Sequence, residues 1–141
     1  MKVKGFVNLR ISGTGLCNEK ISAGLNISHS HFNKKGDTYT NKYTKKTITY
    51  PEDSWYAGIE AQEDETPEDM LSRFVDMLHP HSEYLNKISS SFDVTLWLSF
   101  YPDNEQMNVQ LTHSTILKIC DMGISMNIGA MFLKEIYEGK Y

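Results

Sequence analysis

Four segments of the chain alternate apolar and polar residues with a period of two, which is the pattern of a β-strand with one buried face. They run through residues 3–11, 55–61, 92–100 and 124–130. In the third and strongest, the apolar positions are Phe92, Val94, Leu96, Leu98 and Phe100. Because successive side chains of a strand point to opposite faces, these segments predict a sheet with one apolar and one more polar face.

Helical patterns separate the strands. The clearest helix start is Thr66-Pro67-Glu68-Asp69, because threonine caps, proline suits the first helical position and acids favour the positive end of the helix dipole. The apolar stripe that follows reaches Leu78, and Pro80 interrupts it. Further helices are predicted at 17–25, 84–88 and 113–122. The last is expected to turn Ile116, Ile119 and Cys120 inward, after a short strand through Val109 and Leu111.

The order of these elements predicts one α+β domain over residues 1–141. We expect a mostly antiparallel sheet of four to five strands with helices packed on one face, and a ferredoxin-like arrangement is compatible with this order. Residues 28–50 break the pattern with five lysines against a single aspartate. They predict a basic loop or an exposed hairpin inserted in the domain.

Charge is unevenly distributed along the chain. The basic segment is followed by residues 52–69, which carry eight acids and no base. Such blocks are usually solvated surface, and they can attract one another. The net charge of −4 disfavours a general nucleic-acid binder, because phosphate contacts supply most of that affinity.

The apolar stretches are far shorter than the ~20 residues needed to cross a bilayer. The N-terminal residues alternate in polarity and lack the uninterrupted apolar core of a signal peptide. Cys17 and Cys120 lie far apart and belong to no metal-binding pair, which favours two reduced, partly buried thiols. We therefore expect a cytoplasmic protein without contact to a membrane.

Short motifs along nearly the full length resemble an uncharacterised, mainly bacterial family, domain of unknown function 4279. They are Arg10-Ile11-Ser12-Gly13, Ile21 and Leu25, Lys35-Gly36-Asp37, Trp55, Leu111-Thr112, and the run from Gly123 to Ile128. The resemblance implies no activity, cofactor or catalytic residue. The chain departs from the family's pattern in the extended stretch between Gly36 and Trp55. Small stand-alone bacterial domains often guard against a toxin or bind a partner protein, which is an analogy at the level of the fold.

Several residue patterns are compatible with catalysis. The pairs His29/His31 and His79/His81 can place four imidazoles on a zinc ion if they meet, whereas histidine is commonly a surface residue. Cys17, near a helix N-terminus, is a weak candidate nucleophile because no family signature surrounds it. The acids of residues 60–69 match a solvated face better than a catalytic pair. No cofactor and no metal are expected, and the chain leans away from being an enzyme.

The more polar face of the sheet is the most informative surface. It is predicted to carry Phe6, Asn8, Arg10, Thr95, Trp97, Ser99, Tyr101, Ser125 and Asn127. Aromatic residues mixed with Arg and Asn are typical of a binding platform, unless residues 28–50 or the C-terminal tail fold across it. The candidate binding residues are Phe6, Arg10, Trp55, Trp97, Tyr101, Lys34 and Lys35.

The leading hypothesis is a small non-enzymatic protein-binding module. Its partner would be another protein, as for an immunity-type protein, or a second copy of itself. One alternative is a single-stranded RNA-binding domain that stacks bases on Phe6, Trp97 and Tyr101 and holds phosphates with Lys34–Lys46. A second alternative is a small metal-dependent hydrolase.

Overall fold

The computed structural model describes residues 4–102 and 108–131 of the chain. A five-stranded sheet forms its centre, with the strand order β2-β5-β1-β6-β7. Its strands are β1 (Lys4–Gly13), β2 (His31–Asn33), β5 (Asp53–Glu60), β6 (Asp93–Tyr101) and β7 (Ser125–Ala130). β1 runs antiparallel to β5 and β6, β2 runs antiparallel to β5, and β7 runs parallel to β6. The sheet is therefore mixed.

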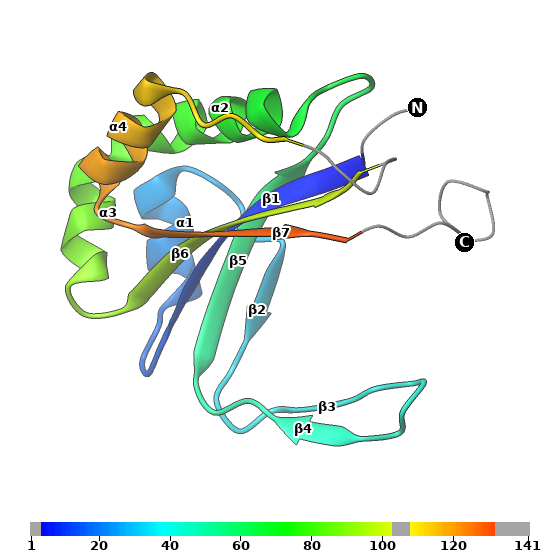
Figure 1. Ribbon diagram of the computed structural model, residues 1–141. Coiled ribbons are helices and arrows are strands. Elements are labelled where there is room, and N and C mark those ends of the chain that lie inside the picture. The colour runs from blue at the N-terminus through cyan, green and yellow to red at the C-terminus, as the bar shows by residue number, and fades with distance from the viewer. Residues whose placement is uncertain (1–3, 103–107, 132–141) are drawn as a thin grey trace.

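The helices pack on one face of this sheet (Figure 1). They are α1 (Asn18–Leu25), α2 (Pro67–Leu78), the 3₁₀ turn η1 (His79–His81), α3 (Ser82–Ser89) and α4 (His113–Met122). This arrangement confirms the predicted α+β class with helices on one side of the sheet. Within the described ranges, every helix is too short or too polar to cross a bilayer.

Alternation builds the core from the strand faces that point toward the helices. In β1 these positions are Val7, Leu9 and Ile11, and all three are fully buried. Their neighbours across the ladders continue the same surface with Trp55 and Ala57 from β5 and Val94, Leu96, Leu98 and Phe100 from β6. Burial of such side chains contributes about 1.5–3 kcal/mol each, so this face dominates the stability of the sheet.

Helix α2 covers the core on the helix side of the sheet. Thr66 caps it, because its side-chain oxygen accepts a hydrogen bond from the Asp69 amide at 3.1 Å. One face of the helix is buried through Pro67, Met70, Leu71, Phe74, Val75 and Leu78. Pro80 ends the regular helix in the turn η1, and α3 follows directly and buries Leu85. The predicted cap, stripe and interruption are thus confirmed.

Helix α4 begins and ends where the sequence predicts, but it is rotated relative to the prediction. Thr112 caps it, and Gly123 ends it with a φ of 68°. The buried residues are Thr115, Ile119 and Met122. Ile116 and Cys120 are exposed, so their predicted inward orientation is wrong. Apolar residues cover most of this helix's circumference, and spacing alone therefore does not select the side that meets the core.

Two further expectations about the sheet differ from the structure. Val109 and Leu111 belong to no strand, and they pack, partly buried, against the core beside the helices. The position beside β6 is occupied by β7 instead. The order is also not ferredoxin-like, because β6, α4 and β7 form a crossover between directly neighbouring parallel strands.

Residues 34–50 form a hairpin that projects from one end of the sheet, away from the helices (Figure 1). Its strands are β3 (Thr38–Thr40) and β4 (Thr47–Thr49). The tip is ordered by Asn41, whose side-chain oxygen accepts hydrogen bonds from the amides of Tyr43 and Thr44 at 2.9 and 3.0 Å. The preceding residues His31–Asn33 pair with β5 instead of belonging to the insertion.

Candidate functional site on the outer face of the sheet

The face of the sheet opposite the helices, the outer face, is laid out in rows by the strand register. Residues directly opposite each other in two ladders point to the same side. Three successive rows are Glu60-Phe6-Ser99, Gly58-Asn8-Trp97-Asn127 and His31-Tyr56-Arg10-Thr95-Ser125. The outer face therefore mixes aromatic, polar and charged side chains.

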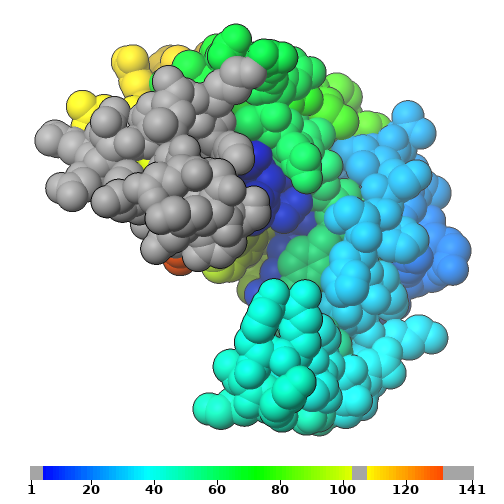
Figure 2. All heavy atoms as spheres, turned by 90° about the vertical axis from the view of Figure 1, so that its right-hand side faces the viewer, coloured from blue at the N-terminus to red at the C-terminus, as the bar shows by residue number. Residues whose placement is uncertain are grey.

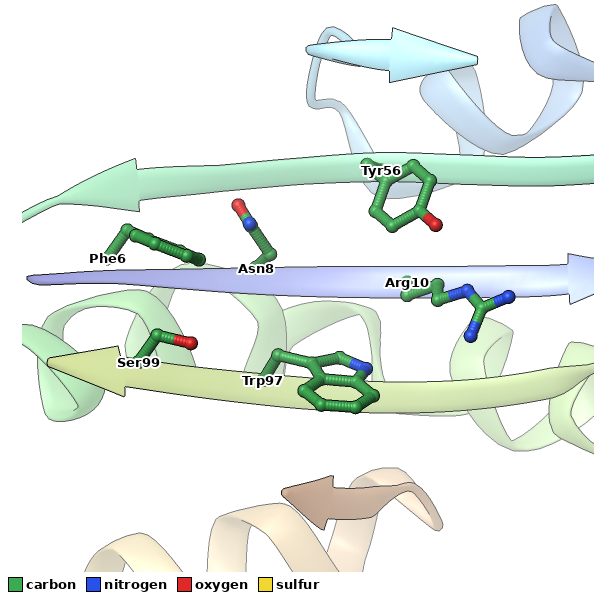
Figure 3. A pocket seen from close by; sticks show the side chains of 6 residues that line it. All are labelled: Phe6, Asn8, Arg10, Tyr56, Trp97 and Ser99. Atoms are coloured by element: carbon green, nitrogen blue, oxygen red, sulfur yellow. The ribbon is translucent and has the colours of Figure 1, made fainter. Parts of the chain in front are cut away.

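A hollow of about 260 Å³ lies in the middle of this face. It is lined by Phe6, Asn8, Arg10, Tyr56, Trp97 and Ser99 from the strands β1, β5 and β6. Figure 3 shows these six side chains in front of the sheet, with the helices behind it. Phe6 and Asn8 also line a second hollow of about 300 Å³ that extends toward Ser30 and Glu60. A continuous concave surface thus crosses the central strands.

Arg10 is the charged centre of the hollow. Its side chain runs along β1 between Tyr56 on β5 and Trp97 on β6 (Figure 3). The guanidinium carbon lies 5.9 Å from the centroid of the Tyr56 ring, a cation–π contact. Its Nε is buried without a hydrogen-bond partner, and no carboxylate of the described residues pairs with Arg10. An unpaired guanidinium beside two aromatic rings is suited to binding a carboxylate or another planar anion.

Gly58 lines the second hollow on the β5 side. A Cβ at this position would overlap the side-chain oxygen of Asn8 and the backbone carbonyl of Val7. The absence of a side chain lets the Asn8 amide lie flat against β5.

An ordered acidic loop borders the outer face at the Glu60 end. Arg73 on α2 binds the Glu65 carboxylate with two hydrogen bonds, from Nε at 3.0 Å and from Nη2 at 2.7 Å. The same Nη2 donates to the Glu60 carbonyl at 2.9 Å, and the Gln62 amide donates to Glu65 at 3.0 Å. The Arg73 hydrogen bonds are the main reason that the pKa of Glu65 lies below its ordinary value.

The structure distributes the predicted binding residues over different surfaces. Phe6, Arg10 and Trp97 meet in the hollow, and Trp97 is 39% exposed. Tyr101 lies on the same face at the end of β6, half-buried and outside the set that lines the hollow. Lys34 and Lys35 are exposed at the base of the hairpin, where the Lys35 amide donates to Asp53 at 2.8 Å. These lysines border the outer face rather than line it.

Trp55 is a wrong choice for a surface binding residue. It is fully buried on the helix side of β5, and its indole nitrogen donates to the Ser22 hydroxyl at 3.3 Å. Tyr56, its neighbour in sequence, lines the hollow instead. Period-two alternation contained this signal, since an inward Trp55 places Tyr56, Gly58 and Glu60 on the opposite face.

The histidines do not come together. His31 lies on β2 with its ring centroid 6.0 Å from that of Tyr56, whereas His79 lies in η1 with its Nε2 3.1 Å from an oxygen of Asp121. Within the two described ranges, no group of three or more His, Cys, Asp or Glu side chains is placed to hold a metal ion. The four-histidine site is therefore not formed.

The cysteines and carboxylates lie on other surfaces. Cys17 is half-buried and donates to Glu19 at 3.4 Å, while Cys120 is exposed on α4, which corrects its predicted partial burial. Glu68 and Asp69 border a small cleft of about 90 Å³ beside the start of α4. The cleft lies between α2 and α4, away from the hollow of the outer face.

Comparison with known proteins bears on the family of the chain. No curated protein and no solved structure matches it. The model of one family, described as a domain of unknown function, matches residues 1–132 of the 141-residue chain. That match covers the whole sheet, the helices and the hairpin. The chain therefore belongs to the family of domain of unknown function 4279 (DUF4279).

Proposed function

We propose that this protein is a non-enzymatic binding module that holds another protein against the outer face of its sheet. The observation that carries the proposal is Arg10, which lies in the hollow between Tyr56 and Trp97 without a carboxylate partner among the described residues. Protein interfaces are enriched in Tyr, Trp, Phe and Arg, and such residues in a central hollow are the usual source of binding energy. The partner would be a toxin, as for an immunity-type protein of a bacterial cytoplasm, or a second copy of this chain.

The chemistry around the hollow supports binding over turnover. Besides Arg10, its lining residues are aromatic or carry neutral amide and hydroxyl groups. The described residues that line it include no carboxylate, imidazole or thiol that could act as a base or a nucleophile. The aromatic rings and the cation provide contact area and an anchor for an acidic group instead.

Site-specific photo-cross-linking tests this proposal. A photoreactive phenylalanine derivative replaces Trp97 in one variant and Ile116 in the other, expressed in the native host. Ile116 is 43% exposed on α4, on the helix side, and is the matched control for Trp97. We expect a covalent protein adduct from position 97 and none from position 116.

The other outcomes decide against the proposal. Adducts that form only with nucleic acid at position 97 would favour the RNA-binding alternative, in which the rings of Phe6 and Trp97 stack on bases. Equal labelling at both positions, or no protein adduct at position 97, would show that the outer face does not hold a protein.

A further inference from the structure

We infer that the partner on the outer face is a second copy of this chain, bound face to face with its strands running in the opposite direction. This inference rests on the proposed function and names the partner for the same surface. It is carried by the arrangement of charge along the strands. When a second copy faces the first with its strands reversed, the positive end of each outer face meets the negative end of the other.

Two charges of opposite sign lie on the outer face, and neither has an ion-pair partner among the described residues. Arg10 occupies one row and Glu60 another, four residues apart along β1, which corresponds to about 13 Å. The Glu60 side chain is exposed, and within the described parts of the chain it has no hydrogen bond or ion pair. Between them lies the row of Gly58, Asn8 and Trp97.

A two-fold axis lies between the two sheets and runs along this middle row, perpendicular to the strands. Rotation about it places the Arg10 row of one copy over the Glu60 row of the other. Glu60 of one copy then lies over Tyr56 and beside Arg10 of the other, and the reverse contact forms at the same time. Trp97 of each copy meets Trp97 of the other near the axis. An interface of this kind is isologous and closed, so it ends at a dimer.

The segments beyond the two ends of the outer face carry the same charges as the rows beside them: the hairpin is basic and the loop after β5 is acidic. The hairpin at the Arg10 end carries Lys42, Lys45 and Lys46, all exposed. The loop at the Glu60 end carries Asp64, which is also exposed, and Arg73 holds that loop in place. The rotation brings the hairpin of one copy to the acidic loop of the other.

The size of the sheet explains why the hairpins are needed. The outer face of five strands, which are three to ten residues long, covers roughly 600 Å². A stable specific interface buries about 800 Å² on each partner. The hairpin projects on the side of the outer face (Figure 2) and exposes Tyr39, Tyr43 and Ile48, which can supply the missing contact area.

Charge reversal tests the arrangement by sedimentation equilibrium at low salt. We expect the wild-type protein to be a dimer, and both Arg10→Glu and Glu60→Arg to raise its dissociation constant at least about tenfold. The control Lys87→Glu makes the same charge change as Arg10→Glu on the exposed helix side and should leave the dissociation constant unchanged.

Restoration of the pairs gives the decisive readout. The double variant Arg10→Glu/Glu60→Arg recreates both contacts with reversed sign, and we expect it to dimerise again. An equimolar mixture of the two single variants should likewise form a mixed dimer, because each pair then joins a glutamate to an arginine. Circular dichroism confirms that each variant is folded.

Two results would overturn the inference. One is a wild-type protein that stays monomeric over the whole accessible concentration range, and the other is a dimer that the single reversals leave intact. Neither result by itself refutes the proposed function. A monomer that still forms adducts with a foreign protein at position 97 would retain the binding face and exclude only the second copy as the partner.

Discussion

At the scale of single residues, burial distinguishes residues of the core from residues that can bind a partner. Trp55 and Trp97 are the two tryptophans of the chain, and one is fully buried whereas the other is 39% exposed. Alternation predicts which side of a strand each residue occupies, but it does not say which side the helices cover. For this reason the sequence pattern alone does not assign Tyr56, rather than Trp55, to the hollow.

The Glu65–Arg73 contact gives a pH-dependent prediction at this scale. The pKa of Glu65 in the folded state is lower than its ordinary value of 4.5, mainly through the hydrogen bonds from Arg73. Its contribution to stability is therefore complete above the ordinary value and is lost as the pH falls through the lowered pKa.

The variant Glu65→Gln removes this titration. We expect its melting temperature to lie below that of the wild type at pH 7, and the difference to shrink as the pH approaches the acid range. Melting curves recorded between neutral and acidic pH measure the difference. A gap that stays constant or widens in acid would contradict the assigned role of the Glu65 carboxylate.

At the scale of elements, the periodicity of apolar residues and the helix caps predict most strands and helices. The strands β1, β5 and β6 and the helix α2 follow from period and caps, because each buries one side against the same core. Which strands pair was not predictable from these patterns. The parallel position of β7 and the pairing of β2 with β5 depend on contacts between distant segments.

The close approach of β5 to β1 at Gly58 gives a prediction for one element. Gly58→Ala places a Cβ against Asn8 and the rigid Val7 carbonyl, and we expect a loss of about 1–3 kcal/mol in the free energy of unfolding. Gly129→Ala in β7 is the matched control, since a Cβ there meets nothing within 4 Å. Its effect should stay within about 0.5 kcal/mol.

Chemical denaturation of the two variants at a concentration that favours the monomer measures both values. Equal losses at the two positions would mean that the contact with Asn8 and Val7 does not determine the effect.

At the scale of the whole molecule, the chain has two different sides. The helices cover one face of the sheet, and the hairpin and the acidic loop flank the other (Figures 1 and 2). Composition predicted the basic and acidic blocks but not their positions at opposite ends of one face. That placement depends on the antiparallel register of β1 and β5, which a single sequence does not reveal.

The central claim is that the chain associates through its outer face, and the quenching of tryptophan fluorescence by acrylamide tests it most directly. The buried Trp55 is a constant background, and the variant Trp97→Phe measures that background alone. We expect quenching of the wild type to be weak in concentrated solution and to rise on dilution as Trp97 becomes accessible. Quenching that is independent of protein concentration, in a protein that still associates, would place the contact elsewhere and contradict the account.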